Sequence, residues 1–282
     1  MKNNIQFLFL LIISIVSTLA VNAQVIPNDS LYLGQTPPGN TPKIFNLPMA
    51  PGLRQMERIA ITSDGKEIYY SELNTYPPTV MRITSFRYQE NKWQRPFIIF
   101  DGYFAPRLSL NDSNMYMQRG INTYISKRTN TGWSMPVRLL STGQQTHYFL
   151  TTKYNNIYAA SNFSTAVENR DICRIITVNS DTIIQNLGMP VSTSYDESDL
   201  FVDENETYLL VCRSINSAAG DILISYKNSN GKWTNPKSLG SKINCPNPNW
   251  EYGQFVTQDN KYLFFTRGGE FYCFILHILG KN

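Results

Sequence analysis

The chain has few of the residues that most often carry enzymatic chemistry. Only two of its 282 residues are histidines and four are cysteines, while charged residues make up 16%. It contains no HExxH sequence, phosphate-binding loop, glycine-rich dinucleotide fingerprint or GxSxG elbow. These absences exclude the best-marked metalloproteases, nucleotide-dependent enzymes and serine hydrolases. We therefore expect no metal and no cofactor.

The charge is low and evenly spread. The formal net charge is +4 and no block of basic residues occurs. Proteins that bind the phosphate backbone concentrate Lys and Arg on one surface, so nucleic acid is a poor choice of partner.

Long apolar runs are missing everywhere except at the N-terminus. Lys2, an apolar run from Phe7 to Val21 and the small-residue exit at Ala23 are typical of a secretory signal peptide. We predict a signal peptide over residues 1–23, a single domain over 24–282 and a periplasmic or secreted protein. A retained N-terminal anchor is the alternative, although the run is short for a membrane span. We expect no transmembrane segment in the mature chain.

The four cysteines are Cys173, Cys212, Cys245 and Cys273, with no CxxC pair. Two of them lie in apolar, strand-like runs, where cysteine behaves as a small hydrophobic residue. A disulfide is the alternative, because export permits one. The spacing does not suit a compact metal site.

A strand–turn–strand unit repeats along the chain. ITSDGKEIYYSE (61–72), LSLNDSNMYMQ (108–118) and VTQDNKYLFFT (256–266) share an apolar strand, an Asp or Asn turn and a second strand. The turns centre on Asp64, Asn111, Lys153, Asn205 and Asp259, at intervals of about 40 to 55 residues, a period typical of propeller blades. Asp, Asn and Gly tolerate the positive φ that tight hairpins require.

A second motif places Trp three residues before Pro, in NKWQRP, TGWSMP and GKWTNP. We interpret Trp93, Trp133 and Trp233 as packing residues on outer strands that hold neighbouring sheets together. The Pro then ends each strand at an edge, where no N–H donor is needed.

These intervals predict an all-β propeller of five four-stranded blades. Too few strands follow Trp250 to complete the last blade, so we expect residues 41–48 to supply its missing strand and close the ring. A sixth, degenerate blade is the alternative.

The repeated units resemble the WD40-like β-propeller repeat of TolB-type proteins, with a blade core of the form ExxPxFSPDGKxLYF. YLGQTPPGNTPKIFNLP followed by ITSDGKEIYYSE is similar to the start of exported, mostly uncharacterised members of that group. The resemblance runs from about Leu31 to about Ile278. It departs from the pattern at Ser63, where Pro is usual, at Asp112, where Gly is usual, and at Lys153. The resemblance implies a binding scaffold in the cell envelope and brings no catalytic residues with it.

Several polar side chains are expected at the start of inner strands, which line the axis of a propeller. The candidate ligand-binding residues are Glu57, Arg58, Arg107, His147, Tyr148, Glu197, Asp199, Glu251 and Tyr252. The alternative is structural, with each Glu capping or bridging a neighbouring loop. Arg107 stands where Ala60, Phe149, Phe201 and Phe255 stand in the other blades, so it either reaches the channel mouth or recognises an anionic group.

Two functions follow from this reading. The first is a non-catalytic, exported scaffold that binds a protein or glycan partner. The second is a glycosidase that pairs two of the axial carboxylates, although SDGKEIYY lacks the spacing and the Trp of an Asp box. A serine hydrolase would need His147, because His277 lies in an apolar closing strand where a structural role is the simpler interpretation.

Overall fold

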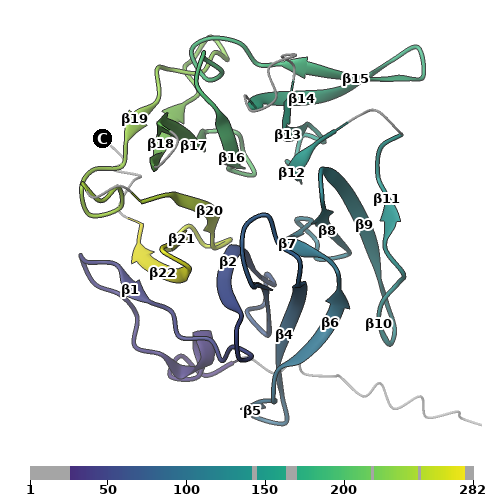
Figure 1. Cartoon of the computed structure of the whole chain (residues 1–282), viewed down its shortest axis with the longest axis vertical. Coiled ribbons are helices and arrows are strands. Elements are labelled where there is room, and N and C mark those ends of the chain that lie inside the picture. The colour runs from purple at the N-terminus through teal and green to yellow at the C-terminus, as the bar shows by residue number, and fades with distance from the viewer. Residues whose placement is uncertain (1–25, 142–144, 163–169, 217–218, 247–248, 277–282) are drawn as a thin grey trace, which may run out of the picture.

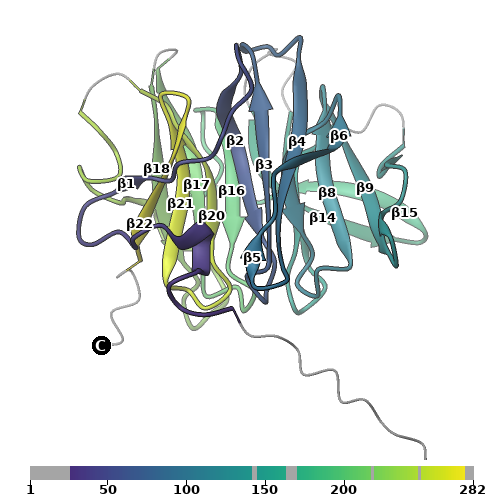
Figure 2. The same ribbon diagram turned by 90° about the horizontal axis from the view of Figure 1, so that it is seen from below.

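The protein is a five-bladed β-propeller, as predicted. The computed structural model describes residues 26–141, 145–162, 170–216, 219–246 and 249–276. Five antiparallel sheets surround a central axis, and in each the first strand lies innermost (Figure 1). The strands run roughly along that axis in the view turned by 90° (Figure 2). The predicted signal peptide, 1–23, and His277 lie outside the described residues.

The first three blades follow one another along the chain, and each is built from the axis outward. Blade 1 contains β2 (Arg54–Ile61), β3 (Glu67–Leu73), β4 (Met81–Gln89), β5 (Lys92–Trp93) and β6 (Phe97–Asp101). Blade 2 contains β7 (Phe104–Leu108), β8 (Asn114–Arg119), β9 (Asn122–Thr129), β10 (Gly132–Trp133) and β11 (Val137–Arg138). Blade 3 contains β12 (His147–Thr151), β13 (Ile157–Asn162), β14 (Arg170–Val178) and β15 (Asp181–Asn186).

The last two blades complete the ring, and blade 5 contains strands from both ends of the chain. Blade 4 contains β16 (Glu197–Val202), β17 (Tyr208–Asn216), β18 (Ala219–Tyr226) and β19 (Lys237–Ser238). Blade 5 contains β20 (Glu251–Val256), β21 (Tyr262–Arg267), β22 (Glu270–Ile275) and β1 (Lys43–Ile44).

The predicted closure of the ring by residues 41–48 is confirmed. Lys43 pairs with Cys273 and Ile44 with Tyr272, and the Phe45 amide donates to the Phe271 carbonyl at 2.8 Å. The short 3-10 helix η1 (Leu31–Gly34) precedes this strand. Covering the edge of β22 in this way removes a template for pairing with another chain.

The hydrophobic core lies between neighbouring blades, because strands of the middle layer are buried on both faces. In β3, Ile68 and Tyr70 pack toward Phe264 of blade 5. Tyr69, on the opposite face, packs against Met115 of blade 2. This two-sided burial explains why the repeated second strands are apolar over consecutive residues, as in EIYY.

A side-chain cap stabilises the repeated turn between the first and second strands. Asp64 Oδ1 accepts hydrogen bonds from Thr62 Oγ1 at 2.8 Å and from the Lys66 amide at 3.0 Å. Gly65 follows with φ +71°. Asp259 makes the equivalent contacts with Thr257 and Lys261. These contacts are the physical reason why Asp recurs at this position.

The turn predicted at Lys153 is misplaced by one residue. The Thr152 amide donates to the Asn156 carbonyl, whereas the Thr62 amide reaches Glu67, one residue further along. The shorter turn puts Tyr154 in the position of Asp64 and Asn155, with φ 59°, in that of Gly65. The residue of blade 3 that is equivalent to Arg107 is therefore Leu150, and not Phe149 as predicted.

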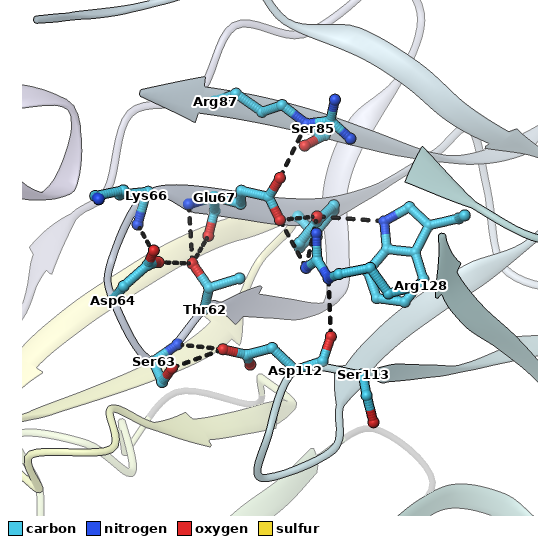
Figure 3. A network of polar contacts seen from close by, with 12 residues as sticks. Thr62, Ser63, Asp64, Lys66, Glu67, Ser85, Arg87, Asp112, Ser113 and Arg128 are labelled. Carbon is cyan, nitrogen blue, oxygen red and sulfur yellow. Dashed lines mark hydrogen bonds and ion pairs between the residues drawn. The ribbon is translucent and has the colours of Figure 1, made fainter. Parts of the chain in front are cut away.

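Turn residues also connect neighbouring blades (Figure 3). Asp112, from the turn of blade 2, accepts hydrogen bonds from the Ser63 amide and hydroxyl at 2.8 and 2.7 Å. Arg128 forms an ion pair of 2.7 Å with Glu67 of blade 1, and its Nε donates to the Asp112 carbonyl. The departure at Asp112 from the usual Gly therefore has a structural role, because its carboxylate reaches the preceding blade.

The prediction that the Trp residues of the repeated motif hold sheets together is confirmed. Trp133 meets Tyr69 of the preceding blade edge-on at 6.0 Å, and its indole N–H donates to the Tyr69 hydroxyl at 3.3 Å. Trp93 donates to the Ser30 carbonyl at 2.7 Å and packs against the cluster between blades 5 and 1. Trp233 packs against the cluster that contains Tyr158 of blade 3.

The cysteines are all free thiols. Three of them are buried, and Cys245 is partly exposed. No group of three or more His, Cys, Asp or Glu side chains within the described ranges could hold a metal ion. No helix in the described part of the chain is long and apolar enough to cross a membrane.

Candidate functional site

A pocket of about 570 Å³ opens at the end of the axis where the innermost strands begin. Four of the predicted residues line it: Glu57, Tyr148, Asp199 and Tyr252. They come from the inner strands of blades 1, 3, 4 and 5. The structure thus brings together residues that lie up to about two hundred positions apart in the sequence.

Breaks in the register of the inner strands position these side chains. The pairing of β2 with β3 shifts between Gln55 and Ile59, and Glu57, inside the break, has φ 71°. β12 has a similar break, in which Tyr148 has φ 58°. Such bulges redirect side chains, and non-glycine residues with positive φ gather at functional sites.

Gly253 makes the close approach of two inner strands sterically feasible. A Cβ atom at this position would lie 1.6 Å from the Glu57 carbonyl oxygen, and the residue has φ +70°. Only glycine fits both conditions. Its amide then donates to Asp199 Oδ2 at 2.7 Å.

A buried ion pair lies next to the pocket; its Asp199 lines the pocket, whereas the predicted residue Arg58 does not. Arg58 and Asp199, each 1% exposed, form an ion pair. Asp199 Oδ1 also accepts from the Leu200 amide at 2.7 Å. The Arg58 guanidinium lies 4.5 Å from the centre of the Tyr148 ring. Both charges are thus compensated, and the pair joins blades 1, 3 and 4 at the axis.

Glu57 is the carboxyl group of the pocket whose pKa lies near neutral pH. Burial raises the pKa of its carboxyl to about 7, and the charge of Asp199 acts in the same direction. The Tyr148 hydroxyl opposes this by donating to Glu57 Oε2 at 2.7 Å. Near neutral pH the carboxyl is about half protonated, so it can donate as well as accept hydrogen bonds.

His147 does not line the pocket, although its ring centre lies 5.9 Å from that of Tyr148. Burial lowers the pKa of its imidazole to about 4, with the charge of Arg170 contributing. The ring is therefore neutral at physiological pH.

Glu197 and Glu251 do not reach the pocket. Arg213 Nε binds Glu197 Oε1 at 2.7 Å, and Arg267 Nε binds Glu251 Oε1 at 2.9 Å. Both glutamates are fully buried, and each pair links the first and second strands of one blade. These two positions match the structural alternative.

Arg107 lies elsewhere along the axis. It lines a separate cavity of about 70 Å³ beside the turns between the first and second strands. That is the opposite end of the inner strands from the larger pocket.

Sequence reasoning missed nine of the thirteen residues that line the larger pocket, among them Tyr76, Arg170 and Trp250. The Arg170 guanidinium donates to Asp196 at 2.9 and 3.1 Å. Arg170 begins β14, the third strand of its blade, whereas the repeated motif marks only the first two strands. Trp250 is the one tryptophan outside the Trp-x-x-Pro motif, and this difference was a usable signal. Gly220 leaves room for its ring, since a Cβ there would lie 2.5 Å from Trp250 Cε3.

No family model matches the chain, and no curated protein matches it. Several solved structures are similar to it, among them a β-propeller domain. TolB from Acinetobacter baumannii is 14% identical with a TM-score of 0.45, and the match covers 77% of this chain and 53% of TolB. A putative 6-phosphogluconolactonase from Bacteroides fragilis is 12% identical with a TM-score of 0.44, over 78% of each chain.

A puromycin-hydrolysing peptidase from Mycobacterium tuberculosis is also similar, at 11% identity and a TM-score of 0.45. The match covers 78% of this chain and 35% of the peptidase. The chain thus spans about a third of the peptidase and about half of TolB.

Proposed function

We propose that the protein is an exported binding protein whose axial pocket holds a small, neutral saccharide. The observation that carries the proposal is a pocket lined both by aromatic side chains and by hydrogen-bonding groups whose charges are largely compensated. Tyr76, Trp250 and Tyr252 supply aromatic surface. Glu57, Asp199 and Arg170 supply donors and acceptors. Sugars offer the same combination, with C–H faces and hydroxyl groups.

The size of the pocket supports a ligand of one or two sugar rings. A volume of about 570 Å³ lies within the range of roughly 300–1,000 Å³ that small-molecule sites occupy. A whole protein domain could not enter it, so a protein partner would have to bind mainly outside the pocket.

The charge of the pocket supports a neutral ligand. Arg58 compensates Asp199, and Asp196 compensates Arg170. The pKa of the Glu57 carboxyl is raised to about 7, so the protonated, neutral form is well populated near neutral pH. A strongly charged ligand would therefore meet two buried charges that are already paired, while Arg54, which also lines the pocket, is exposed to solvent.

The cellular location is part of the proposal. The predicted signal peptide over residues 1–23 would deliver the domain of residues 24–282 to the periplasm or the medium, where saccharides are available.

The test is calorimetric titration of the purified protein with a panel of neutral mono- and disaccharides. Tyr76→Ala should weaken binding about tenfold, because it removes one aromatic wall. Tyr154→Ala is the matched control: the two tyrosines are 61% and 59% exposed, but Tyr154 lies in a turn away from the pocket. Absence of binding by any saccharide, or an equal loss in both variants, would refute the proposal. Recovery of a protein partner from envelope fractions, without saccharide binding, would favour a protein ligand.

Glycoside hydrolysis is the second candidate, favoured by the Glu57 carboxyl with its pKa near 7. A general acid of this class has a raised pKa. Asp199 is the neighbouring carboxylate, but both its oxygens already accept hydrogen bonds from amides. Turnover of an aryl glycoside panel that is lost in Glu57→Gln would establish this activity, whereas binding without turnover would support the first proposal.

A further inference from the structure

The small cavity at the other end of the axis contains a cation that forms no ion pair with the described residues. Arg107 lines this cavity and is 9% exposed. Its guanidinium makes no hydrogen bond or ion pair within the described ranges, and its Nη1 atom is enclosed without a partner. The neighbouring axial arginine, Arg58, is paired with Asp199. Arg58 also has enclosed atoms without a partner, Nε and Nη1, but its charge is compensated, whereas Arg107 has no ion pair among the described residues.

Aromatic rings hold the Arg107 guanidinium in place. It lies 4.7 Å from the centre of the Phe201 ring and 5.8 Å from that of Phe255. Ala60 and Leu150 occupy the equivalent positions in blades 1 and 3, so four of the five blades place an apolar residue here. The cation is a specific feature of blade 2 and not a property of the repeat.

Arg107 keeps its charge despite burial. Burial lowers the pKa of the guanidinium to about 9, and the charge of Arg58 acts in the same direction. The group is therefore protonated at neutral pH. Of the three guanidinium nitrogens, only Nη1 is enclosed without a partner among the described residues. We therefore take the edge formed by Nε and Nη2 as the one that is accessible to a ligand in the cavity.

We propose that this cavity is a second binding site, which takes a single carboxylate group on the Nε and Nη2 edge of Arg107. That edge matches the two oxygens of a carboxylate, and a guanidinium held between rings is preorganised for this geometry. The volume of about 70 Å³ limits the ligand to one small anionic group. Asp112, Asp203 and Glu204 also line the cavity, so a dianion such as phosphate would be repelled more strongly than a carboxylate with a single charge.

The carboxylate can belong to a free small acid or to the C-terminus of a peptide, and both present the same chemistry. The first test follows the melting temperature of the purified protein in sodium acetate, sodium chloride and sodium phosphate at constant ionic strength. A ligand that binds only the folded state raises the melting temperature. We expect acetate to raise it, and chloride and phosphate not to, at millimolar concentrations where the general stabilising effect of phosphate is small.

The variant that tests the site is Arg107→Met, which keeps the shape and removes the charge. The acetate-dependent rise should disappear in it, while saccharide binding at the larger pocket stays unchanged. Arg119→Met is the matched control, because Arg119 also faces an aromatic ring, that of Tyr103, but is exposed. If Arg107→Met does not fold, Arg107→Gln replaces it, and the comparison of anions on the unaltered protein remains decisive.

The second arm identifies the source of the carboxylate. Gly-Gly-Gly with a free C-terminus is compared with its C-terminal amide. A rise that only the free acid gives, lost in Arg107→Met, assigns the site to peptide termini; a rise with acetate alone assigns it to free acids. The proposal is overturned if no carboxylate raises the melting temperature, if chloride does so equally, or if the rise persists without Arg107.

Discussion

The Tyr148 hydroxyl donates a hydrogen bond of 2.7 Å to Glu57 Oε2 across 91 positions of the sequence. Both residues have positive φ, at bulges in the inner strands of blades 3 and 1. Two separate distortions of regular strands thus meet in one hydrogen bond at the pocket. Backbone strain of this kind persists where the surrounding structure fixes it, and here it positions the titratable group of the pocket.

The first prediction concerns this hydrogen bond. Tyr148→Phe should raise the pKa of Glu57 above its value of about 7, because the hydroxyl stabilises the ionised carboxylate while burial and Asp199 oppose ionisation. The measurement is a titration of glutamate side-chain carboxyl carbons by ¹³C NMR. The transition near pH 7 should be absent in Glu57→Gln, which identifies the signal. An unchanged or lower value in Tyr148→Phe would contradict the assigned role of the hydroxyl.

The fold was largely predictable because propeller blades repeat their constraints. Each turn needs a cap such as that of Asp64 on Thr62, so Asp and Asn recur at a readable spacing. Residues 41–48 were predictable as the closing strand because blade 5 otherwise lacks one. The turn at Lys153 was misplaced because its cap is supplied differently: Thr152 donates to Glu206 of the next blade at 2.8 Å.

The site was only partly predictable, for a physical reason. Glu57, Glu197 and Glu251 stand at similar positions before their turns, yet only Glu57 lines the pocket. Glu197 and Glu251 lie one residue further from their turns than Glu57 does, and at that position Arg213 and Arg267 pair with them from adjacent strands. Such pairing depends on tertiary contacts, and a repeat pattern contains no information about it.

The second prediction concerns Glu206, which bridges blades 3 and 4. Burial raises the pKa of its carboxyl, but the hydrogen bonds from Lys227, Asn156 and Thr152 outweigh burial and lower it to about 2. Glu206→Gln should cost about 1–3 kcal/mol of unfolding free energy at pH 7, since it removes charged hydrogen bonds at a buried position.

The pH dependence of that cost has a defined sign. A carboxyl with a lowered pKa in the folded state contributes stability above its unfolded value, near 4.5, and loses it as the pH falls toward 2. Urea unfolding of the original protein and of Glu206→Gln should therefore converge between about pH 5 and pH 2. Glu204→Gln, two residues away, is the control and should show little difference at any pH. A gap for Glu206→Gln that stays constant down to pH 2 would show that the carboxylate charge is not the cause.

The third prediction concerns the closure of the ring. Phe45 follows β1, is 4% exposed and meets Phe264 edge-on at 5.2 Å in the cluster between blades 5 and 1. Phe45→Ala should cost about 3–5 kcal/mol, as expected for the removal of a buried aromatic side chain. Ile44→Ala is the matched control, because Ile44 is the preceding residue, pairs with the same strand and is 40% exposed.

The comparison tests closure itself, because both variants keep the backbone pairing of β1 with β22. If the N-terminal segment seals the ring through its buried side chain, guanidinium unfolding should shift strongly for Phe45→Ala and by less than about 1 kcal/mol for Ile44→Ala. The Phe45→Ala protein should also aggregate more readily when partly unfolded, since release of β1 exposes the edge of β22. Equal and small effects for both variants would mean that the buried side chain of Phe45 does not contribute to the closure of the ring.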